Sequence, residues 1–283
     1  MKNKNLSRAF PRRKFLKTLA IAGAGVALPW PVLAQSRRVN AVGLQLYSLR
    51  AEMGADFEGT LAKLAEIGFK EMEFAGYFDK TPSQVRRILD ANGLTSSAAH
   101  IPLEAIRNNL NQVIDTAAAI GQKYIVLPYM VGADREYDNY ARIADLLNRA
   151  GEASKAAGIK MGYHNHDFEF DKHDGRMGYD VLLEQTDDDL VSFEMDLYWA
   201  ATAGIDPRDY FRKYPGRFTM LHVKDQAANG EMADVGRGII DFADIFSMAD
   251  IAGFEHYFIE HDNPSDGINS ITYSYNTVNQ LRF

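Results

Sequence analysis

Four potential metal ligands recur at regular intervals through the C-terminal half of the sequence. They are His164 in Tyr-His-Asn-His, Asp196 in Phe-Glu-Met-Asp, His222 in Leu-His-Val-Lys-Asp and Glu260 in Phe-Ile-Glu-His-Asp. Successive ligands are separated by 32, 26 and 38 residues, and each separation is about one strand–helix unit. Since residues at the ends of neighbouring parallel strands can converge on one point, the spacing predicts a single four-ligand metal site.

The ligand types limit which metal this site could hold. Imidazole and carboxylate groups suit Mn, Zn, Fe, Co or Ni better than Ca. The sequence contains no cysteine, which excludes thiolate ligands and disulfide bonds. We therefore expect one divalent metal ion, with an open coordination position for substrate oxygens.

The ligands are expected to lie on the later strands of a barrel. Several β-rich runs are apolar on both faces, as parallel strands buried under helices must be. Eight strand–helix units in about 250 residues favour a closed (β/α)8 TIM barrel over an open doubly wound sheet. No Gly-x-Gly-x-x-Gly turn follows a strand, so a dinucleotide-binding fold has no support. The expected strands are residues 42–49, 71–75, 95–101, 123–129, 160–166, 191–197, 218–224 and 256–262.

The first 34 residues have the pattern of an export signal. Arg12 and Arg13 precede a modestly apolar run at 18–29, and Val32-Leu33-Ala34 resembles a cleavage site. The apolar run is shorter than the roughly 20 residues that span a bilayer, so we expect no stable membrane span after removal of the signal. The sequence thus predicts a twin-arginine signal peptide, a TIM barrel over 35–283, and a periplasmic or secreted location.

Composition narrows the class of partner. The net charge is −7 and the isoelectric point is about 5.5, which disfavours a large phosphate-binding surface. Nucleic acid is therefore not expected as a partner, whereas a small sugar or keto-sugar substrate is. The sequence is compatible with a homo-oligomer.

Five segments occur in order along the chain: Tyr163-His164-Asn165-His166, Phe193-Glu194-Met195-Asp196, Leu221-His222-Val223-Lys224-Asp225, Val235-Gly236-Arg237-Gly238 and Ile259-Glu260. Together they resemble the sugar phosphate isomerase/epimerase family of xylose-isomerase-like TIM barrels, and the resemblance extends over essentially the whole mature chain. Members of that family commonly place a Glu, an Asp, a His and a second Glu around one divalent metal. Here a histidine stands at the first of these positions.

The resemblance implies different roles for the two neighbouring histidines. His164 falls where the first family ligand falls, so we assign it to the metal. His166 lies two residues further along the same strand face and is assigned to substrate binding or proton transfer, with the reverse assignment left open. The resemblance also implies that Glu73, at the end of the second strand, contacts substrate or acts as an acid. The alternative is a buried carboxylate paired with Lys70 or Lys80.

Other residues at the strand ends are candidates for substrate binding. Gln45 and His100 end the first and third strands, and His100 is expected to contact a hydroxyl or an oxyanion. Lys224 or Arg237 could bind a negative oxygen, although Arg237, between two glycines, could instead anchor a loop. Trp199 could stack on a sugar ring or belong to the core.

The leading hypothesis is a metal-dependent isomerase or epimerase that removes a proton next to the carbonyl of a small sugar. His166, Glu73 or Glu260 would act as the general base. Return of the proton gives isomerisation, whereas loss of a β-leaving group gives the alternative, a keto-glycoside lyase or hydrolase or a dehydratase. Two other classes were weighed. The metal ligands argue against a non-catalytic carbohydrate-binding barrel, and acidity and export argue against a nuclease.

Overall fold

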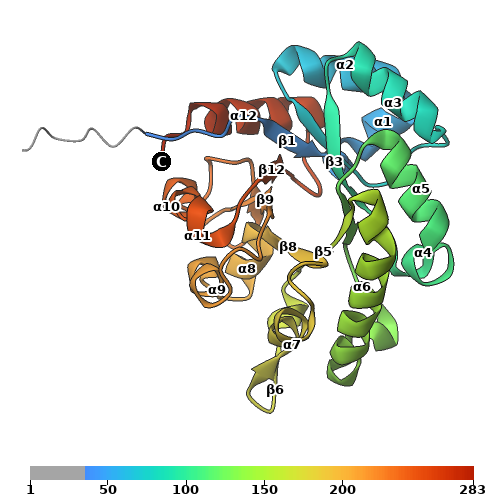
Figure 1. The fold of residues 1–283 in the computed structure, drawn as a ribbon. Helices are drawn as coiled ribbons and strands as arrows, with labels where there is room; N and C mark the ends of the chain where they lie inside the picture. Colours follow the sequence, from blue (N-terminus) through green and yellow to red (C-terminus); the bar gives the residue numbers. More distant parts are fainter. Residues whose placement is uncertain (1–35) are drawn as a thin grey trace, which may run out of the picture. The chain divides into compact units, whose positions relative to one another are not determined.

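The computed structural model describes residues 36–283, so the predicted signal segment, with Arg12 and Arg13, lies outside the described residues. Within the described part, eight parallel strands close into one barrel, with neighbours in the order β1, β12, β9, β8, β5, β4, β3 and β2 (Figure 1). This confirms the predicted (β/α)8 TIM barrel. The strands are β1 (Val42–Gln45), β2 (Glu71–Phe74), β3 (Thr95–His100), β4 (Tyr124–Leu127), β5 (Lys160–His164), β8 (Val191–Asp196), β9 (Met220–Val223) and β12 (His256–Ile259).

Helices connect the strands and lie outside them (Figure 1). They are α1 (Arg50–Ala55), α2 (Phe57–Ile67), α3 (Pro82–Ala91), α4 (Leu103–Asn108), α5 (Leu110–Ile120), α6 (Tyr140–Ser154), α7 (Gly178–Gln185), α8 (Leu197–Thr202), α9 (Pro207–Lys213), α10 (Phe242–Ser247), α11 (Ala249–Ala252) and α12 (Gly267–Gln280). Short 3-10 turns are η1 (Leu46–Leu49), η2 (Gly132–Arg135), η3 (Tyr137–Asn139), η4 (Lys155–Ala157) and η5 (Phe168–Phe170). Two small hairpins pair β6 (Lys172–His173) with β7 (Arg176–Met177) and β10 (Asp225–Gln226) with β11 (Met232–Ala233). Among the described residues, no helix combines the length and the apolar character that crossing a membrane requires.

Local sequence explains where the helices begin. The side chain of Asp56 accepts a hydrogen bond of 3.0 Å from the backbone N–H of Gly59, which caps α2. Thr81 and Gln84 form a reciprocal capping box at the start of α3, where Pro82 occupies the first turn.

Several strands are shorter than expected because a cap or a turn begins at their ends. The strand expected over 42–49 stops at Gln45, whose side chain accepts a hydrogen bond from the backbone N–H of Tyr47 and so starts a 3-10 turn. The strand expected over 123–129 stops at Leu127, just before Pro128. These early ends leave the following residues free to shape the mouth of the barrel.

The barrel interior holds a compact apolar layer below its mouth. Its residues are Ala98, Tyr124, Val126, Met220 and Phe258. Gly162 completes the layer on β5, because a Cβ atom there would lie 2.8 Å from the side chain of Val126. Below the mouth, the barrel is therefore a packed core, and chemistry is confined to the residues that follow this layer along the strands.

Candidate active site

The polar residues of the mouth share the strand faces that carry the apolar layer. His222 follows Met220 by two residues and Glu260 follows Phe258 by two, so alternation along the strands directs both into the barrel. The same rule applies on the neighbouring strands. The polar residues gathered here are Glu73, His100, His164, Glu194, Asp196, His222 and Glu260, and they are buried except for the partly exposed His100.

The four predicted metal ligands converge. His164, Asp196, His222 and Glu260 each offer a ligand atom within 4.8 Å of those of the other three, and all four are buried. Nε2 of His164 lies 3.1 Å from Oδ2 of Asp196, and Nδ1 of His222 lies 2.7 Å from Oε2 of Glu260. The structure thus brings together the four side chains that the sequence spacing places at neighbouring strand ends.

Neighbouring groups orient two of these ligands. Nδ1 of His164 lies 3.1 Å from the carbonyl of Pro128, so its N–H can donate there and Nε2 is left as the donor atom for a metal. Oδ1 of Asp196 accepts from the backbone N–H of Trp199 and caps α8, which leaves Oδ2 to face the site. The side chain of Asn165 accepts from the backbone N–H of Asp196 and fixes the end of β8.

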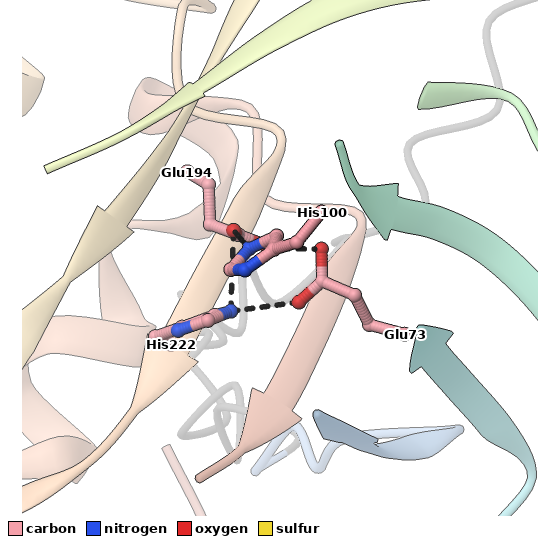
Figure 2. A group of neighbouring side chains, drawn as sticks. All are labelled: Glu73, His100, Glu194 and His222. Carbon is pink, nitrogen blue, oxygen red and sulfur yellow. Dashed lines mark hydrogen bonds and ion pairs between the residues drawn. The ribbon is translucent and has the colours of Figure 1, made fainter. Parts of the chain in front are cut away.

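A second group of four side chains lies around the other edge of His222 (Figure 2). Nε2 of His222 lies 2.7 Å from Oε2 of Glu73 and 3.1 Å from Oε2 of Glu194. Nε2 of His100 lies 2.8 Å from Oε2 of Glu194 and 3.4 Å from Oε1 of Glu73. Each imidazole therefore lies between the two carboxylates, and His222 belongs to both groups.

Charge is distributed unevenly in the second group. Burial, with the charge on Glu194 adding to it, raises the pKa of Glu73. Burial also opposes ionisation of Glu194, but His222 and His100 outweigh it and hold the pKa of that carboxyl well below its usual range. Burial alone would lower the pKa of His222, yet Glu194 and Glu260 raise it well above its ordinary value. Glu194 is therefore the ionised carboxylate of this group, and its charge lies against Nε2 of His222.

Lys224 supplies a buried positive charge beside the metal-ligand group. Its Nζ lies 3.0 Å from Oδ2 of Asp196, 2.7 Å from Oε2 of Glu260 and 2.8 Å from Oδ1 of Asp262. Burial alone would lower the pKa of Lys224, but these three carboxylates raise it well above its ordinary value. The ammonium group is thus held as the counter-charge of the acidic ligands.

His166 lies next to the metal-ligand group without belonging to it. Its ring centroid is 4.9 Å from that of His164, 5.1 Å from that of Trp199 and 4.7 Å from that of Tyr129. Burial, with His164 and Lys224 adding to it, lowers the pKa of His166 to about 2, so the ring is neutral. Its Nδ1 is buried and has no hydrogen-bond partner among the described residues.

A cavity of about 700 Å³ opens at this end of the barrel. His100, His164 and His166 line it together with Lys224 and Glu260, so two of the predicted metal ligands and the two predicted substrate or proton-transfer histidines share one space. Glu73, by contrast, is fully buried and lies outside this lining; it pairs with His222 and His100 rather than with Lys70 or Lys80.

Three predicted substrate contacts do not line the cavity. Gln45 caps the turn after β1, and its Nε2 is buried without a partner in the described part of the chain. Trp199 is absent from the lining and packs beside His166, with its ring centroid 6.0 Å from Nζ of Lys224. These positions support Trp199 and Gln45 as groups that hold the site in place.

Arg237, a predicted substrate contact, lies away from the main cavity. It lines a separate pocket of about 350 Å³, its side chain is 58% exposed, and it pairs with Asp234 and covers the ring of Tyr273. The flanking glycines donate their backbone N–H groups to Oδ2 of Asp225, each at 2.9 Å, because the loop turns back at Gly236 with φ 94°. The loop-anchor alternative fits this position, whereas substrate binding in the main cavity does not.

Two site residues were not assigned from sequence. Glu194 precedes Asp196 by two residues, so strand alternation could have placed it on the same face. Glu169 accepts hydrogen bonds of 2.8 Å from the hydroxyl of Tyr163 and from the backbone N–H of His166. No sequence pattern marks that contact, because Glu169 reaches back from the 3-10 turn η5.

The four converging ligands suit a divalent transition metal. They combine two imidazoles with two carboxylates, and their four buried ligand atoms all lie within 4.8 Å of one another. Buried nitrogen and oxygen ligands that converge this closely are what a bound cation would bridge. The residues therefore fit a metal, next to a cavity in which a small polar molecule can approach it.

Comparison with known proteins places this site in context. A family model described as xylose isomerase-like TIM barrel matches residues 61–272. Among curated proteins, inosose dehydratase from Lacticaseibacillus casei is 25% identical over 257 residues, covering 74% of this chain and 83% of that protein.

Solved structures agree on the architecture. A sugar phosphate isomerase/epimerase from Parabacteroides distasonis is 27% identical with a TM-score of 0.73, covering 88% of this chain and 97% of that one. The protein IOLI, whose structure contains a zinc atom, is 14% identical with a TM-score of 0.65, covering 86% and 99%, and at that identity it supports the fold alone.

Proposed function

Because the chain belongs to the xylose isomerase-like TIM-barrel family, we propose that it is a metal-dependent lyase acting on a keto-sugar or a related keto-polyol. The reaction would be loss of a leaving group from the carbon β to the carbonyl. The main support is the position of His166, an imidazole that lines one cavity together with His164 and Glu260 of the four-ligand group.

His164, Asp196, His222 and Glu260 would hold the metal. Bound there, a divalent ion would act as a Lewis acid toward the carbonyl and hydroxyl oxygens of the substrate. Lys224 would keep the carboxylates of Asp196 and Glu260 ionised, which is the form that binds cations.

His166 would carry the proton. Its ring would accept the proton from the carbon next to the carbonyl, and the C–H electron pair would become part of a new C=C bond. The C–O bond to the leaving group on the adjacent carbon breaks at the same time or afterwards. The proton now on His166 can pass to the departing oxygen, so the overall change is one elimination with no further reactant.

Two observations favour elimination over epimerisation. Epimerisation is simplest with two proton-transferring groups at the substrate, but Glu73 is buried outside the cavity lining and Glu260 is engaged by His222 and Lys224. In addition, curated relatives that cover about three quarters of the chain are dehydratases, which catalyse an elimination. We therefore prefer the lyase to a pure isomerase.

Turnover in deuterated solvent tests the proposal. Metal-loaded protein would be incubated with 2-keto-myo-inositol and, separately, with a 3-keto-glucoside, and followed by NMR and ultraviolet absorbance. The expected result is an unsaturated ketone together with the released leaving group. Deuterium exchange with recovery of an isomer, and no unsaturated product, would instead establish an isomerase.

A location outside the cytoplasm is part of the proposal. The Arg12-Arg13 pattern suggests export, which would expose the enzyme to sugars outside the cytoplasm. Such substrates are usually not phosphorylated, which agrees with the absence of an unpaired cation among the cavity-lining residues that the structure describes.

A further inference from the structure

The cavity has two chemically different halves. One half carries His164, His166, Lys224 and the acidic side chains at the ends of β5, β9 and β12, and His100 at the end of β3 joins it. The other half is formed by segments that follow β2, β3 and β4. Its residues include Ala75, Ile101, Ala105, Val113, Pro128 and Tyr129.

The apolar half has no assigned role in the proposed reaction. Proton transfer and metal binding use the polar half alone, whereas the cavity as a whole, at about 700 Å³, lies in the upper part of the roughly 300–1,000 Å³ range of pockets for drug-sized ligands. A single polyol ring needs only part of that space. Its hydroxyl groups would also lack hydrogen-bond partners against Ile101 and Val113.

Two tyrosines give the cavity flat, accessible walls. Tyr47 and Tyr129 are 43% and 41% exposed, which is unusual for large side chains in this protein, and both line the cavity. An arginine lies over each ring: Cζ of Arg50 is 4.3 Å from the ring centroid of Tyr47, and Cζ of Arg135 is 4.3 Å from that of Tyr129. The rings are thus held in place and can pack against a flat apolar group.

The residues that line the cavity offer little free positive charge. Among the described residues that line this cavity, Lys224 is the sole lysine or arginine, and three carboxylates already surround it. A phosphate or carboxylate on the substrate would find no free counter-charge there.

We propose that the substrate is a keto-glycoside whose aglycone is apolar, with an aromatic ring preferred. This inference rests on the proposed function and adds the leaving group to it. The keto-sugar would occupy the polar half beside His166 and the aglycone would lie between Tyr129 and the wall formed by Ala105 and Val113. In a 3-keto-glucoside, the C2–H bond and the C1–O bond to the aglycone break, a C1=C2 bond forms, and the aglycone leaves as a neutral phenol or alcohol.

Binding of two inert glycosides tests the apolar half without any turnover. Phenyl β-D-glucoside and methyl β-D-glucoside would be titrated by calorimetry into the metal-loaded protein and into the metal-free protein. We expect the phenyl glycoside to bind about ten- to a hundredfold more tightly, as burial of one ring predicts. Equal affinities within about twofold would overturn the proposal.

Matched substitutions locate the preference. Ala105→Trp should fill the apolar half and remove the preference for the phenyl glycoside while the methyl glycoside still binds. Ala118→Trp, on the exposed face of the neighbouring helix α5, should leave both affinities unchanged. Val113→Ser is a smaller change and should reduce the phenyl affinity alone. Equal loss of both ligands in Ala105→Trp and Val113→Ser would contradict the assigned halves.

The aglycone site and the proposed lyase activity can each be refuted without refuting the other. Elimination from 2-keto-myo-inositol with no discrimination between phenyl and methyl glycosides would leave the lyase and remove the aglycone site. A clear phenyl preference that Ala105→Trp abolishes, with no elimination from any keto-sugar, would retain the aglycone site and remove the lyase.

Discussion

Nε2 of His222 lies 2.7 Å from Oε2 of Glu73, on the edge of the ring opposite Nδ1, which lies 2.7 Å from Oε2 of Glu260. A histidine that donates its Nε2–H to a carboxylate presents an unprotonated Nδ1 to a metal. The buried carboxylates Glu73 and Glu194 therefore have a consequence for metal binding even though neither lines the cavity.

Loss of a carboxylate in the second group should weaken metal binding. Glu73→Gln and Glu194→Gln should each lower the affinity about 10- to 100-fold, because His222 loses the charged acceptor that orients its ring. Titration with Mn²⁺ or Zn²⁺ against a competing chelator measures this. Glu71→Gln is the matched control, since Glu71 pairs with His256 on β12 instead. Equal affinities in all three variants would show that the second group has no role in metal binding.

Removal of a ligand should abolish metal binding. Asp196→Ala and His222→Ala should each lose the roughly one equivalent of divalent metal expected per barrel, because each takes away one of four converging donors. Elemental analysis after dialysis measures the content. His256→Ala, which changes a histidine at the start of β12, should keep it. Unchanged metal content in Asp196→Ala and His222→Ala would refute the four-ligand site.

The convergence of the four candidate ligands was predictable because two simple periodicities determine it. The strand–helix repeat places His164, Asp196, His222 and Glu260 at the ends of four strands, and parallel strands in a closed barrel end at one mouth. Alternation along β8 contains the same information for Glu194, which lies two residues before Asp196 in the Phe-Glu-Met-Asp motif.

Contacts made by loops could not be predicted from the periodicity of the sequence. The direction of Arg237 depends on the loop conformation that Asp225 fixes by accepting hydrogen bonds from Gly236 and Gly238. These tertiary contacts have no periodicity in the sequence. The same holds for Glu169, which reaches His166 from a 3-10 turn. Glu73 was correctly placed at a strand end, but its burial below the cavity lining depends on packing around His222 and His100.

Export is predicted to depend on the arginine pair. Changing Arg12 and Arg13 to lysine should keep the protein in the cytoplasm with its leader uncut, because twin-arginine transport recognises that pair. Cell fractionation and the mass of the mature chain measure the result. Lys14→Arg in the same segment is the matched control, and normal processing of the double lysine variant would refute the twin-arginine assignment.

Glu169 should make stability depend on pH. Burial raises its pKa from 4.5 to about 8, so the unfolded chain ionises before the folded one. The contribution of Glu169 to the free energy of unfolding is complete below about pH 4.5. It is lost as pH rises through about 8, and the loss is up to about 5 kcal/mol. The Glu169→Gln variant should lack this decline. Urea denaturation at about pH 5 and about pH 9 measures it, with exposed Glu152→Gln as the control. Parallel pH profiles for wild type and Glu169→Gln would contradict the shift.

His166 and His164 should separate metal binding from proton transfer. His166 lines the cavity beside the ligand group without joining it, so His166→Gln should keep the metal while turnover falls by roughly 10²–10⁴, the usual contribution of a positioned acid–base group. His164→Gln should lose metal and activity together. Metal content and turnover on a keto-sugar, with deuterium exchange next to the carbonyl, would be measured for both variants. If His166→Gln loses the metal and His164→Gln keeps it, the two roles are reversed. If His166→Gln retains metal and full exchange, the ring only shapes the cavity, and Glu260 becomes the remaining predicted base that lines it.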